Sequence, residues 1–281
     1  MTERSPSKTA AGVAFLRAAH QLIDGEPKVL ADTVAAKLLH PKSLEWMLAN
    51  QAELQTPKSR ALRSHVLTRS RFAEDRLEEA FARGMRQYVL LGAGFDSFAY
   101  RQPAWASGLR IFEVDHPASQ QDKQERLKNA GIVPPGNLIW AGIDFETTSL
   151  RDGLLQSGFD PSAPAFIACL GVLAYLEEAA VNQVFTFVAS LPRSSEIVFT
   201  FTGTQQEVRD PSFPSLAERV AAIGEPFRSH LVEEELVPKL TGFGFSEVFV
   251  LTPEQSQARY FQGRTDGLPA PQRARIASAR V

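Results

Sequence analysis

Two glycines and two acids, set about twenty residues apart, are the residues of this chain best suited to holding a ligand. Gly92 and Gly94 follow the apolar run at 88–91, which predicts a buried strand that leads through a turn into a helix. Without a Cβ atom, such a turn lets a ligand touch the backbone. Glu113 and Asp115 end the next apolar run, where an α/β nucleoside site places its acceptor for ribose hydroxyls. The spacing predicts a site for an adenosine-containing cofactor.

The turn lacks features that a phosphate-bearing cofactor needs. Ser97 occupies the third glycine position of a dinucleotide fingerprint, and the sequence contains no P-loop motif. Asp96 would place negative charge beside a phosphate at the start of the expected helix, which is unfavourable. The same carboxylate suits a cationic cofactor without phosphates, and S-adenosylmethionine fits that description. Glu113 and Asp115 share one face of an extended strand, so either could accept the ribose hydroxyls.

Composition disfavours several other classes of protein. The 281 residues carry a net charge of −2, so nothing predicts binding to nucleic acid or to an anionic membrane. No apolar run reaches membrane-spanning length, and the single cysteine, Cys169, excludes an internal disulfide. We therefore expect a cytoplasmic protein with no membrane partner. The five histidines lie far apart and show no metal-ligand spacing, so we expect no metal site.

The order of strand-like and helix-like runs predicts the fold. Residues 1–86 have helical patterns, including an apolar segment at 29–39 and prolines at two expected helix starts, Pro41 and Pro57. The expected strands are 88–91, 109–114, 137–141, 165–169, 196–201 and 246–251, and the expected later helices are 118–130, 149–157, 177–190, a segment within 205–223, and 233–241. This alternation indicates an α/β, Rossmann-like, mostly parallel seven-stranded sheet with helices on both faces. A helical cap precedes the sheet, and an insert follows its fifth strand.

We expect a single domain over residues 1–281, with four parts. These are the helical cap (1–86), the cofactor-binding core (87–202), a substrate-side insert (203–243) and a C-terminal part with strands and a tail (244–281). In open α/β sheets, ligands bind at the carboxyl ends of the strands. The cap and the insert would then form the walls of a substrate pocket.

Four segments in this order, 69–75, 87–101, 113–117 and 170–176, resemble a known family. They are similar to the bacterial class I S-adenosylmethionine-dependent methyltransferases related to leucine carboxyl methyltransferase, a group that includes O-methyltransferases of polyketide pathways. The resemblance extends over nearly the whole chain. It implies S-adenosylmethionine as the cofactor and transfer of its methyl group to oxygen on a small molecule.

The resemblance also implies roles for residues at the first two strand ends. Gly92, Ala93 and Gly94 would approach the cofactor with their backbone, and Asp115 would accept the ribose hydroxyls. Asp115 could instead be a surface acid that caps the next helix. His116 lies in the turn after Asp115 and is expected beside the cofactor, where it could also serve as a structural hydrogen-bonding group.

Four further residues match blocks that contact the cofactor in the relatives. Asp144 and Phe145 resemble the pair that contacts adenine, although Asp144 could equally cap the helix that follows. Arg17 and Arg69 match basic positions that hold the cofactor's carboxylate, a task that suits the guanidinium fork. On a helix, each arginine could also face solvent.

The segment after the fourth strand departs from the family pattern. In leucine carboxyl methyltransferase a glutamate there holds the cofactor's amino group, and this chain has Leu170. Backbone carbonyls near Gly92 or Cys169 are candidates to replace it. Tyr175 could line the methyl-transfer site, or belong to the core. His230 could act as a base or contact the substrate.

The sequence contains no convincing general base, which favours a carboxylate or an acidic hydroxyl as acceptor. We therefore expect a small-molecule methyl acceptor as the partner, with a homodimer left open. Two other functions stay open: an NAD(P)-dependent oxidoreductase, and a catalytically silent binding protein with a methyltransferase fold.

Overall fold

The computed structural model describes residues 8–145, 147–202, 216–273 and 275–281. One sheet of seven strands forms the centre of the molecule. The strands are β1 (Gln87–Leu91), β2 (Arg110–Asp115), β3 (Leu138–Gly142), β4 (Ala165–Cys169), β5 (Glu196–Thr200), β6 (Glu247–Val250) and β7 (Ile276–Arg280).

Helices precede the sheet and separate its strands. Those of the cap are α1 (Lys8–Ile23), the 3-10 turn η1 (Ala35–Leu38), α2 (Pro41–Ala49), α3 (Gln51–Leu54) and α4 (Pro57–Ala82). The later ones are the 3-10 turns η2 (Phe98–Tyr100) and η3 (Ala104–Gly108), α5 (Pro117–Asn129), α6 (Leu150–Gln156), the 3-10 turn η4 (Leu173–Tyr175), α7 (Glu178–Ala189), α8 (Leu216–Ala222), α9 (Glu233–Phe243), α10 (Pro253–Ser256) and the π-helical turn η5 (Gln257–Phe261).

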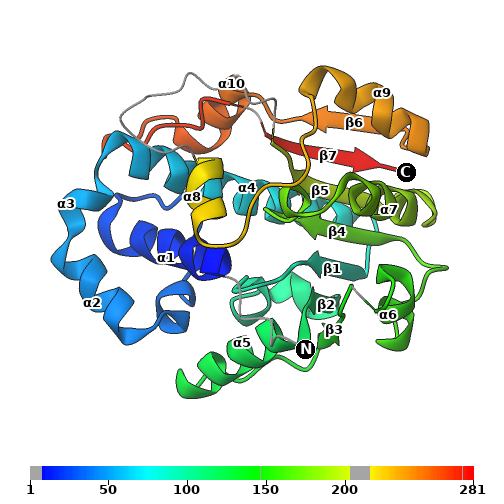
Figure 1. Ribbon diagram of the computed structural model, residues 1–281, viewed down its shortest axis with the longest axis horizontal. Helices are drawn as coiled ribbons and strands as arrows, with labels where there is room; N and C mark the ends of the chain where they lie inside the picture. Colours follow the sequence, from blue (N-terminus) through cyan, green and yellow to red (C-terminus); the bar gives the residue numbers. More distant parts are fainter. Residues whose placement is uncertain (1–7, 146, 203–215, 274) are drawn as a thin grey trace.

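The strands lie in the order β3-β2-β1-β4-β5-β7-β6. Strands β1 to β5 pair in parallel, whereas β7 runs antiparallel to both β5 and β6. In Figure 1, β7 points away from α1, so the parallel strands point toward the helical cap. The carboxyl ends of β1 to β4 therefore face the cap. The predicted α/β sheet with an N-terminal helical cap is confirmed.

Both faces of the sheet are buried, which explains why its strands are apolar runs rather than alternating ones. On β1, Val89 and Leu91 pack in the apolar layer that α6, α7 and α9 complete. Tyr88 and Leu90 point the other way, into a layer that α4 completes. Helices thus cover both faces, as the sequence predicted.

Proline and a capping side chain define two helix starts in the cap. Pro41 and Pro57 are the first residues of α2 and α4, where the missing N–H costs no hydrogen bond. The His40 side chain accepts a hydrogen bond from the Lys42 backbone, and Thr56 accepts one from Ser59. Both predicted starts are confirmed.

The segment 29–39 is not the helix that its apolar character suggested. Only η1 is helical there, and it is a single short turn. The Asp32 carboxylate accepts the backbone N–H groups of Val34 and Ala35, at 3.1 and 2.9 Å. A carboxylate that accepts hydrogen bonds from the N–H groups two and three residues later ends an extended segment and starts a turn. This local hydrogen bonding replaced the predicted longer helix.

The α-helix expected directly after the glycine turn is also absent, and the prediction was wrong. The chain forms only the 3-10 turns η2 and η3 before β2 begins. The place on the sheet that such a helix would cover is taken by α4, which contributes Phe72, Ala73, Leu77 and Ala80 to the apolar layer. A helix that precedes β1 thus replaces the one expected after it.

The other expected helices are present, and their ends differ from the predicted ones by no more than two residues. The helix expected within 205–223 appears as α8, and residues 203–215 of the predicted insert lie outside the described residues. The sequence did not locate β7, because its alternating small residues, Ala277, Ser278 and Ala279, form no apolar run. The division into four parts stays a prediction.

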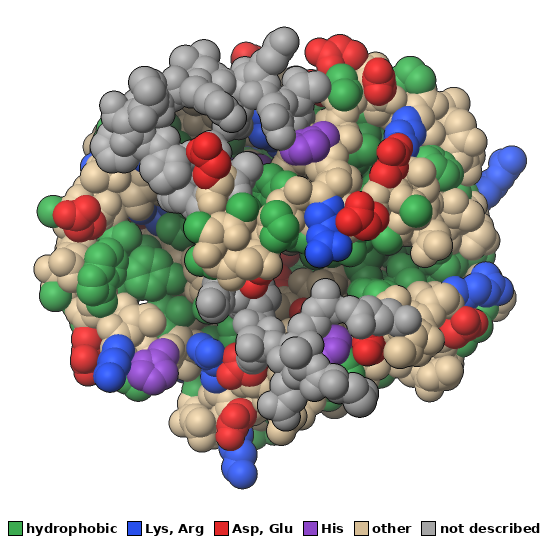
Figure 2. All heavy atoms as spheres, in the orientation of Figure 1, with side chains coloured by type: hydrophobic (Ala, Val, Ile, Leu, Met, Phe, Trp, Pro, Cys, Tyr) green, Lys and Arg blue, Asp and Glu red, His purple; other side chains and the backbone are tan. Residues whose placement is uncertain are grey.

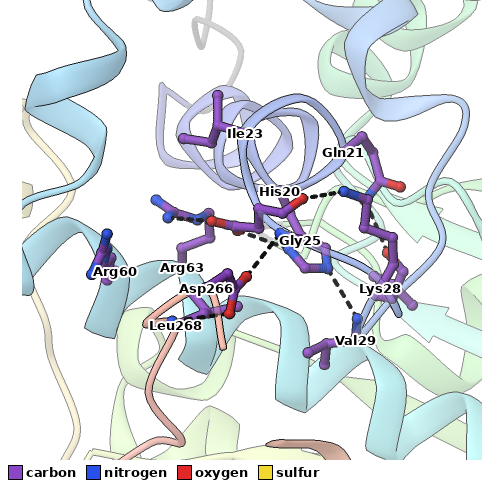
Figure 3. A network of polar contacts seen from close by, with 12 residues as sticks. His20, Gln21, Ile23, Gly25, Lys28, Val29, Arg60, Arg63, Asp266 and Leu268 are labelled. Carbon is purple, nitrogen blue, oxygen red and sulfur yellow. Dashed lines mark hydrogen bonds and ion pairs between the residues drawn. The ribbon is translucent and has the colours of Figure 1, made fainter. Parts of the chain in front are cut away.

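A buried ion pair joins α1 to α4 (Figure 3). Arg63 donates two hydrogen bonds of 2.7 Å to the Asp24 carboxylate, and His20 Nδ1 lies 2.8 Å from the same group. Burial alone would raise the pKa of Asp24, but the hydrogen bonds from His20 and Arg63 bring it below its ordinary value. His20 Nε2 accepts the Val29 N–H at 3.0 Å, which makes Nδ1 the protonated nitrogen of a neutral ring.

The loop at Gly25 is held from the other end of the chain. Asp266 accepts the Gly25 N–H at 2.8 Å (Figure 3). Its carboxylate is also paired with Arg264. Burial would raise the pKa of Asp266, but hydrogen bonds from Arg264, Gly25 and Leu268 lower it to about 2. The C-terminal segment thus anchors the loop that follows α1.

None of the helices in the described ranges is long and apolar enough to cross a membrane.

Replacement of Arg63 tests the buried pair. Arg63→Met leaves the Asp24 carboxylate buried without its main partner, so we expect the free energy of unfolding to fall by about 3–5 kcal/mol. Urea denaturation measures this. Arg71→Met, which breaks the partly exposed pair with Asp75 on the same helix, should cost less than about 1 kcal/mol. Equal losses in the two variants would contradict the assignment.

Asp266 should make stability depend on pH in the acid range. Because its folded pKa lies below its unfolded value, the stabilisation is complete above about pH 4 and is lost as the pH falls toward 2. The stability difference between wild type and Asp266→Asn should therefore shrink by about 2 kcal/mol over that range. Denaturation at several pH values measures it. A difference independent of pH would show that the charge of Asp266 contributes nothing.

Candidate functional site

The predicted cofactor residues lie in spatial order along the carboxyl edge of four adjacent strands. Asp144 and Phe145 follow β3, Asp115 ends β2, the glycine turn follows β1, and Cys169 ends β4. The strands are paired in register up to this edge, with Leu91 opposite Val114 and Asp115 opposite Gly142. Segments between Gly92 and Cys169 that are far apart along the chain thus meet at one line.

The glycine turn is bonded directly to the end of β2. The Gly92 and Ala93 N–H groups both donate to the Val114 carbonyl, at 2.8 and 3.0 Å, and the Gly94 N–H donates to Asp115 Oδ2 at 2.6 Å. Gly92 and Gly94 have φ values of +68° and +46°, a conformation that other residues rarely adopt. A Cβ atom on Gly92 would lie 2.4 Å from the Val172 side chain. The turn therefore has no room for a side chain at Gly92.

Only one of the two acids at β2 reaches the edge of the sheet. Glu113 is fully buried, and Lys123 on α5 binds it at 2.7 Å. Burial raises the pKa of Glu113 to about 7, although the Lys123 charge opposes that rise. Asp115 is partly exposed, and its two oxygens accept the N–H groups of Gly94 and His116. Of the two acids, Asp115 is the one placed to meet a ligand.

His116 has a structural task in addition to any contact with a ligand. Its Nδ1 accepts the Ala118 N–H at 3.2 Å, so it caps the start of α5. At β3, the Asp144 carbonyl accepts the N–H groups of Thr147 and Thr148. The Phe145 side chain is 48% exposed, which is unusual for a large apolar ring and leaves a face free for stacking. None of these contacts tests whether Asp144 and Phe145 bind adenine, so that role stays a prediction.

Arg69 lies on α4 with its guanidinium against the turn after β4. A Cβ atom on Gly171 would come within 2.6 Å of Arg69 Nη1, and Gly171 has a φ of +75°. The Arg69 Nε is buried and makes no hydrogen bond in the described part of the chain. Burial, aided by the nearby Arg17 cation, lowers the pKa of Arg69 to about 10, while Tyr175 and Asp96 oppose this. The side chain therefore stays charged at neutral pH, with its Nε available among the described residues.

Arg17, the second predicted carboxylate ligand, already has partners within the protein. Its Nε donates to Asp32 at 2.8 Å, and its Nη2 donates to the Phe95 carbonyl in the glycine turn. The side chain is almost fully buried. Arg17 therefore links α1 to the turn, and a direct contact with the cofactor stays a prediction.

Asp32 is a site residue that sequence reasoning missed. Besides Arg17, it accepts a hydrogen bond of 2.7 Å from the Ser97 hydroxyl, and Arg101 lies 3.6 Å away. Arg101 in turn binds both oxygens of Glu74. Burial would raise the pKa of Asp32, but the two arginines and Ser97 hold it below its usual value. A lone acid in the apolar segment 29–39 was the available signal, because a buried carboxylate needs partners.

The segment after β4 brings the predicted acceptor-side residues near one another. Tyr175 in η4 contacts the Phe227 ring edge-on, with centroids 5.3 Å apart. The backbone N–H groups of Arg228 and Ser229 donate to the Ala174 carbonyl, so the loop before α9 is bonded to η4. His230 follows in that loop, is exposed, and lies 3.4 Å from the Thr202 hydroxyl.

Cys169 and Leu170 have no reactive side chain at this edge. Cys169 is fully buried, and burial raises the pKa of its thiol to about 12, so it is not a nucleophile at neutral pH. Leu170 packs against the apolar layer that α4 completes. Any contact of these two residues with a cofactor would use their backbone. In the part of the chain that the structure describes, no group of three His, Cys, Asp or Glu side chains could hold a metal ion.

The strand order with a reversed seventh strand defines a methyltransferase-like α/β fold, and solved structures agree. A DUF574 family protein from Streptomyces avermitilis has a TM-score of 0.58 at 17% identity, covering 98% of this chain and 97% of that one. A Thermobifida fusca protein provisionally named as a methyltransferase has a TM-score of 0.57 at 16% identity, covering 98% and 95%.

The sequence comparisons define the family. The model of the leucine carboxyl methyltransferase family matches residues 10–189. YktD of Bacillus subtilis, provisionally named as an S-adenosyl-L-methionine-dependent methyltransferase, is 30% identical and covers 96% of each chain. The chain belongs to the leucine carboxyl methyltransferase family.

The close approach at Gly92 gives a test of the turn. Gly92→Ala places a Cβ atom against Val172 in a conformation that alanine rarely adopts, so we expect a loss of stability of more than about 1 kcal/mol. Thermal or urea unfolding measures it. Gly12→Ala, in α1 with no atom near its added Cβ and no positive φ, is the matched control and should be neutral or stabilising. A Gly92→Ala protein as stable as wild type would contradict the crowding.

Proposed function

We propose that the chain transfers the methyl group of S-adenosylmethionine to oxygen on a small-molecule carboxylate or acidic hydroxyl. The observation that carries the proposal is the order of groups along the edge from β3 to β4. An aromatic ring and an acid come first, then a ribose-type acceptor, a glycine turn and finally the Arg69 guanidinium, whose Nε has no hydrogen-bond partner among the described residues. The parts of S-adenosylmethionine that these groups would bind follow in the same order, from its adenine through its ribose to its amino acid.

Each part of the cofactor would meet a group of matching chemistry. Phe145 offers an exposed ring face to adenine, and Asp144 an acceptor for its exocyclic amine. Asp115, at the tip of β2, would accept from the ribose hydroxyls. Arg69 would bind the carboxylate through its guanidinium, whose Nε makes no hydrogen bond to any residue that the structure describes. The backbone at Gly92, Ala93 and Gly94 would lie against the cofactor between these ends.

Methyl transfer from a sulfonium is an in-line displacement, so the protein mainly has to align the acceptor and exclude water. Burial raises the pKa of Tyr175, so its phenol is protonated at neutral pH and can donate a hydrogen bond but not remove a proton. His230 is exposed on the neighbouring loop, where it could contact the acceptor. With Tyr175 protonated, an acceptor that is already ionised fits this site best. A polyketide-type acid or phenol would satisfy that requirement.

The choice of partners is also part of the proposal. Figure 2 shows acidic and basic side chains interspersed over one face, with apolar side chains gathered at its left, over the helical cap. Leu22, Trp46 and Leu48 on α1 and α2 are each about half exposed. Such a surface favours association with a second copy of the chain. We expect no nucleic-acid or membrane partner, and a cytoplasmic location.

Two rival functions differ from the proposal in what they predict. One predicts a different ligand, and the other predicts cofactor binding without methyl transfer. An NAD(P)-dependent oxidoreductase would bind NAD(H), but Ser97 replaces the third fingerprint glycine and is itself bonded to Asp32. A silent binding protein would bind the cofactor and transfer nothing. Calorimetric titration with S-adenosylhomocysteine and with NAD(H) addresses the first rival, and methyl transfer to a panel of acids and phenols addresses the second. Binding of NAD(H) alone would overturn the proposal.

Asp115→Ala gives the residue-level test. Removal of a charged acceptor should weaken S-adenosylhomocysteine binding by about 1–3 kcal/mol in the same titration. Glu125→Ala removes an exposed acid from α5, the helix that follows Asp115, and should leave the affinity unchanged. A folded Asp115→Ala protein with wild-type affinity would remove Asp115 from the site.

A further inference from the structure

Asp96 is a carboxylate of the glycine turn that has no assigned role. Its backbone N–H donates to the Ala93 carbonyl at 2.7 Å, and its Oδ1 accepts the Phe98 N–H at 2.8 Å. These two bonds fix the direction of the side chain. Its other oxygen, Oδ2, makes no hydrogen bond with any described residue, and the side chain is only partly buried. One oxygen therefore shapes the turn, and the other is available.

Two neighbouring arginines at this edge are already paired with carboxylates. Arg17 is paired with Asp32, and Arg101 is paired with Glu74. Arg69 and Asp96 differ from them. The Arg69 guanidinium lies against Gly171, and the next residue, Val172, lies against Gly92 in the same turn as Asp96. The Asp96 charge also raises the otherwise lowered pKa of Arg69, yet within the described residues the two side chains form no ion pair. A positive and a negative group thus lie near each other without being joined.

This separation matches one kind of ligand. An α-amino acid carries its ammonium and carboxylate on the same carbon, so a site for it needs a cation and an anion that are close but not paired. A carboxylate alone would satisfy Arg69 and leave Asp96 beside a like charge, which is unfavourable. A neutral tail would leave the buried Arg69 Nε without a partner, which costs free energy.

We propose that Asp96 binds the ammonium group of the cofactor's amino acid while Arg69 binds its carboxylate. The inference rests on the proposed function and adds to it a residue that selects an intact α-amino acid tail. It supplies the charged ammonium acceptor that the side chain of Leu170 cannot provide. The glycine turn then has two tasks: its backbone lies against the cofactor, and its Asp96 side chain binds the ammonium group at the amino-acid end.

Asp96→Asn separates the charge from the shape of the turn, because an asparagine oxygen can still accept the Phe98 N–H. Three probes are titrated by calorimetry: S-adenosylhomocysteine, its deaminated analogue with a hydroxyl in place of the amine, and 5′-methylthioadenosine, which lacks the amino acid. We expect Asp96→Asn to weaken S-adenosylhomocysteine binding roughly tenfold or more. The other two probes should bind the variant as they bind wild type.

Two further variants sharpen the result. Arg69→Met should weaken both probes that carry a carboxylate and leave 5′-methylthioadenosine unchanged. Glu247→Gln removes one negative charge from β6, at the opposite edge of the sheet, and controls for a change in net charge. It should change no affinity.

The outcomes are distinct. Unchanged binding of S-adenosylhomocysteine to Asp96→Asn, or an equal loss for all three probes, would overturn the role of Asp96 and leave the proposed function standing. Wild-type protein that binds none of the three probes would overturn the proposed function itself, and this inference with it.

Discussion

The site depends on one buried carboxylate, that of Asp32. It accepts hydrogen bonds from Arg17 on α1, from the Ser97 hydroxyl and from two backbone N–H groups at the start of η1. A carboxylate without contact to water is costly unless its oxygens are satisfied, and here the partners come from three separate segments. The cap, the 29–39 segment and the turn after β1 are therefore held in one arrangement.

The segment after the glycine turn, which forms 3-10 turns and no α-helix, belongs to the same network. Ser97 and Arg101 lie where the first turn of that helix would form, and their side chains are bound to Asp32 and Glu74 instead. Through Arg101 and Glu74, this segment links the turn to α4. Because α4 then covers this face of the sheet, Arg69 is carried to the end of β4, where it meets Gly171.

The charged groups at the edge of the sheet fall into two kinds, those in buried ion pairs and those outside them. Glu113 with Lys123, Asp32 with Arg17, and Glu74 with Arg101 are pairs whose loss would leave a buried charge. Asp115 and Asp96 each accept a hydrogen bond from a backbone N–H group of the turn and remain partly exposed. In the described part of the chain, Arg69 Nε makes no hydrogen bond. Groups of the second kind lose little in the free protein and gain most when a ligand of opposite charge arrives.

The amino-acid sequence by itself determined the class of fold and the edge at which a ligand would lie. Apolar runs at 88–91 and 109–114, each followed by glycine or acid, suffice for that because strand burial and backbone sterics act over a few residues. It also located the helix starts at Pro41 and Pro57. The sequence did not predict the strand β7, with its alternating small residues, or the short turn η1, since the structure of both depends on distant partners. Only the tertiary structure decided which acid of β2 is buried and which is partly exposed, what Arg17 binds, and that Arg69 and Asp96 form no ion pair within the described residues. Those outcomes depend on side chains from segments far apart in the chain, whose contacts no local pattern records.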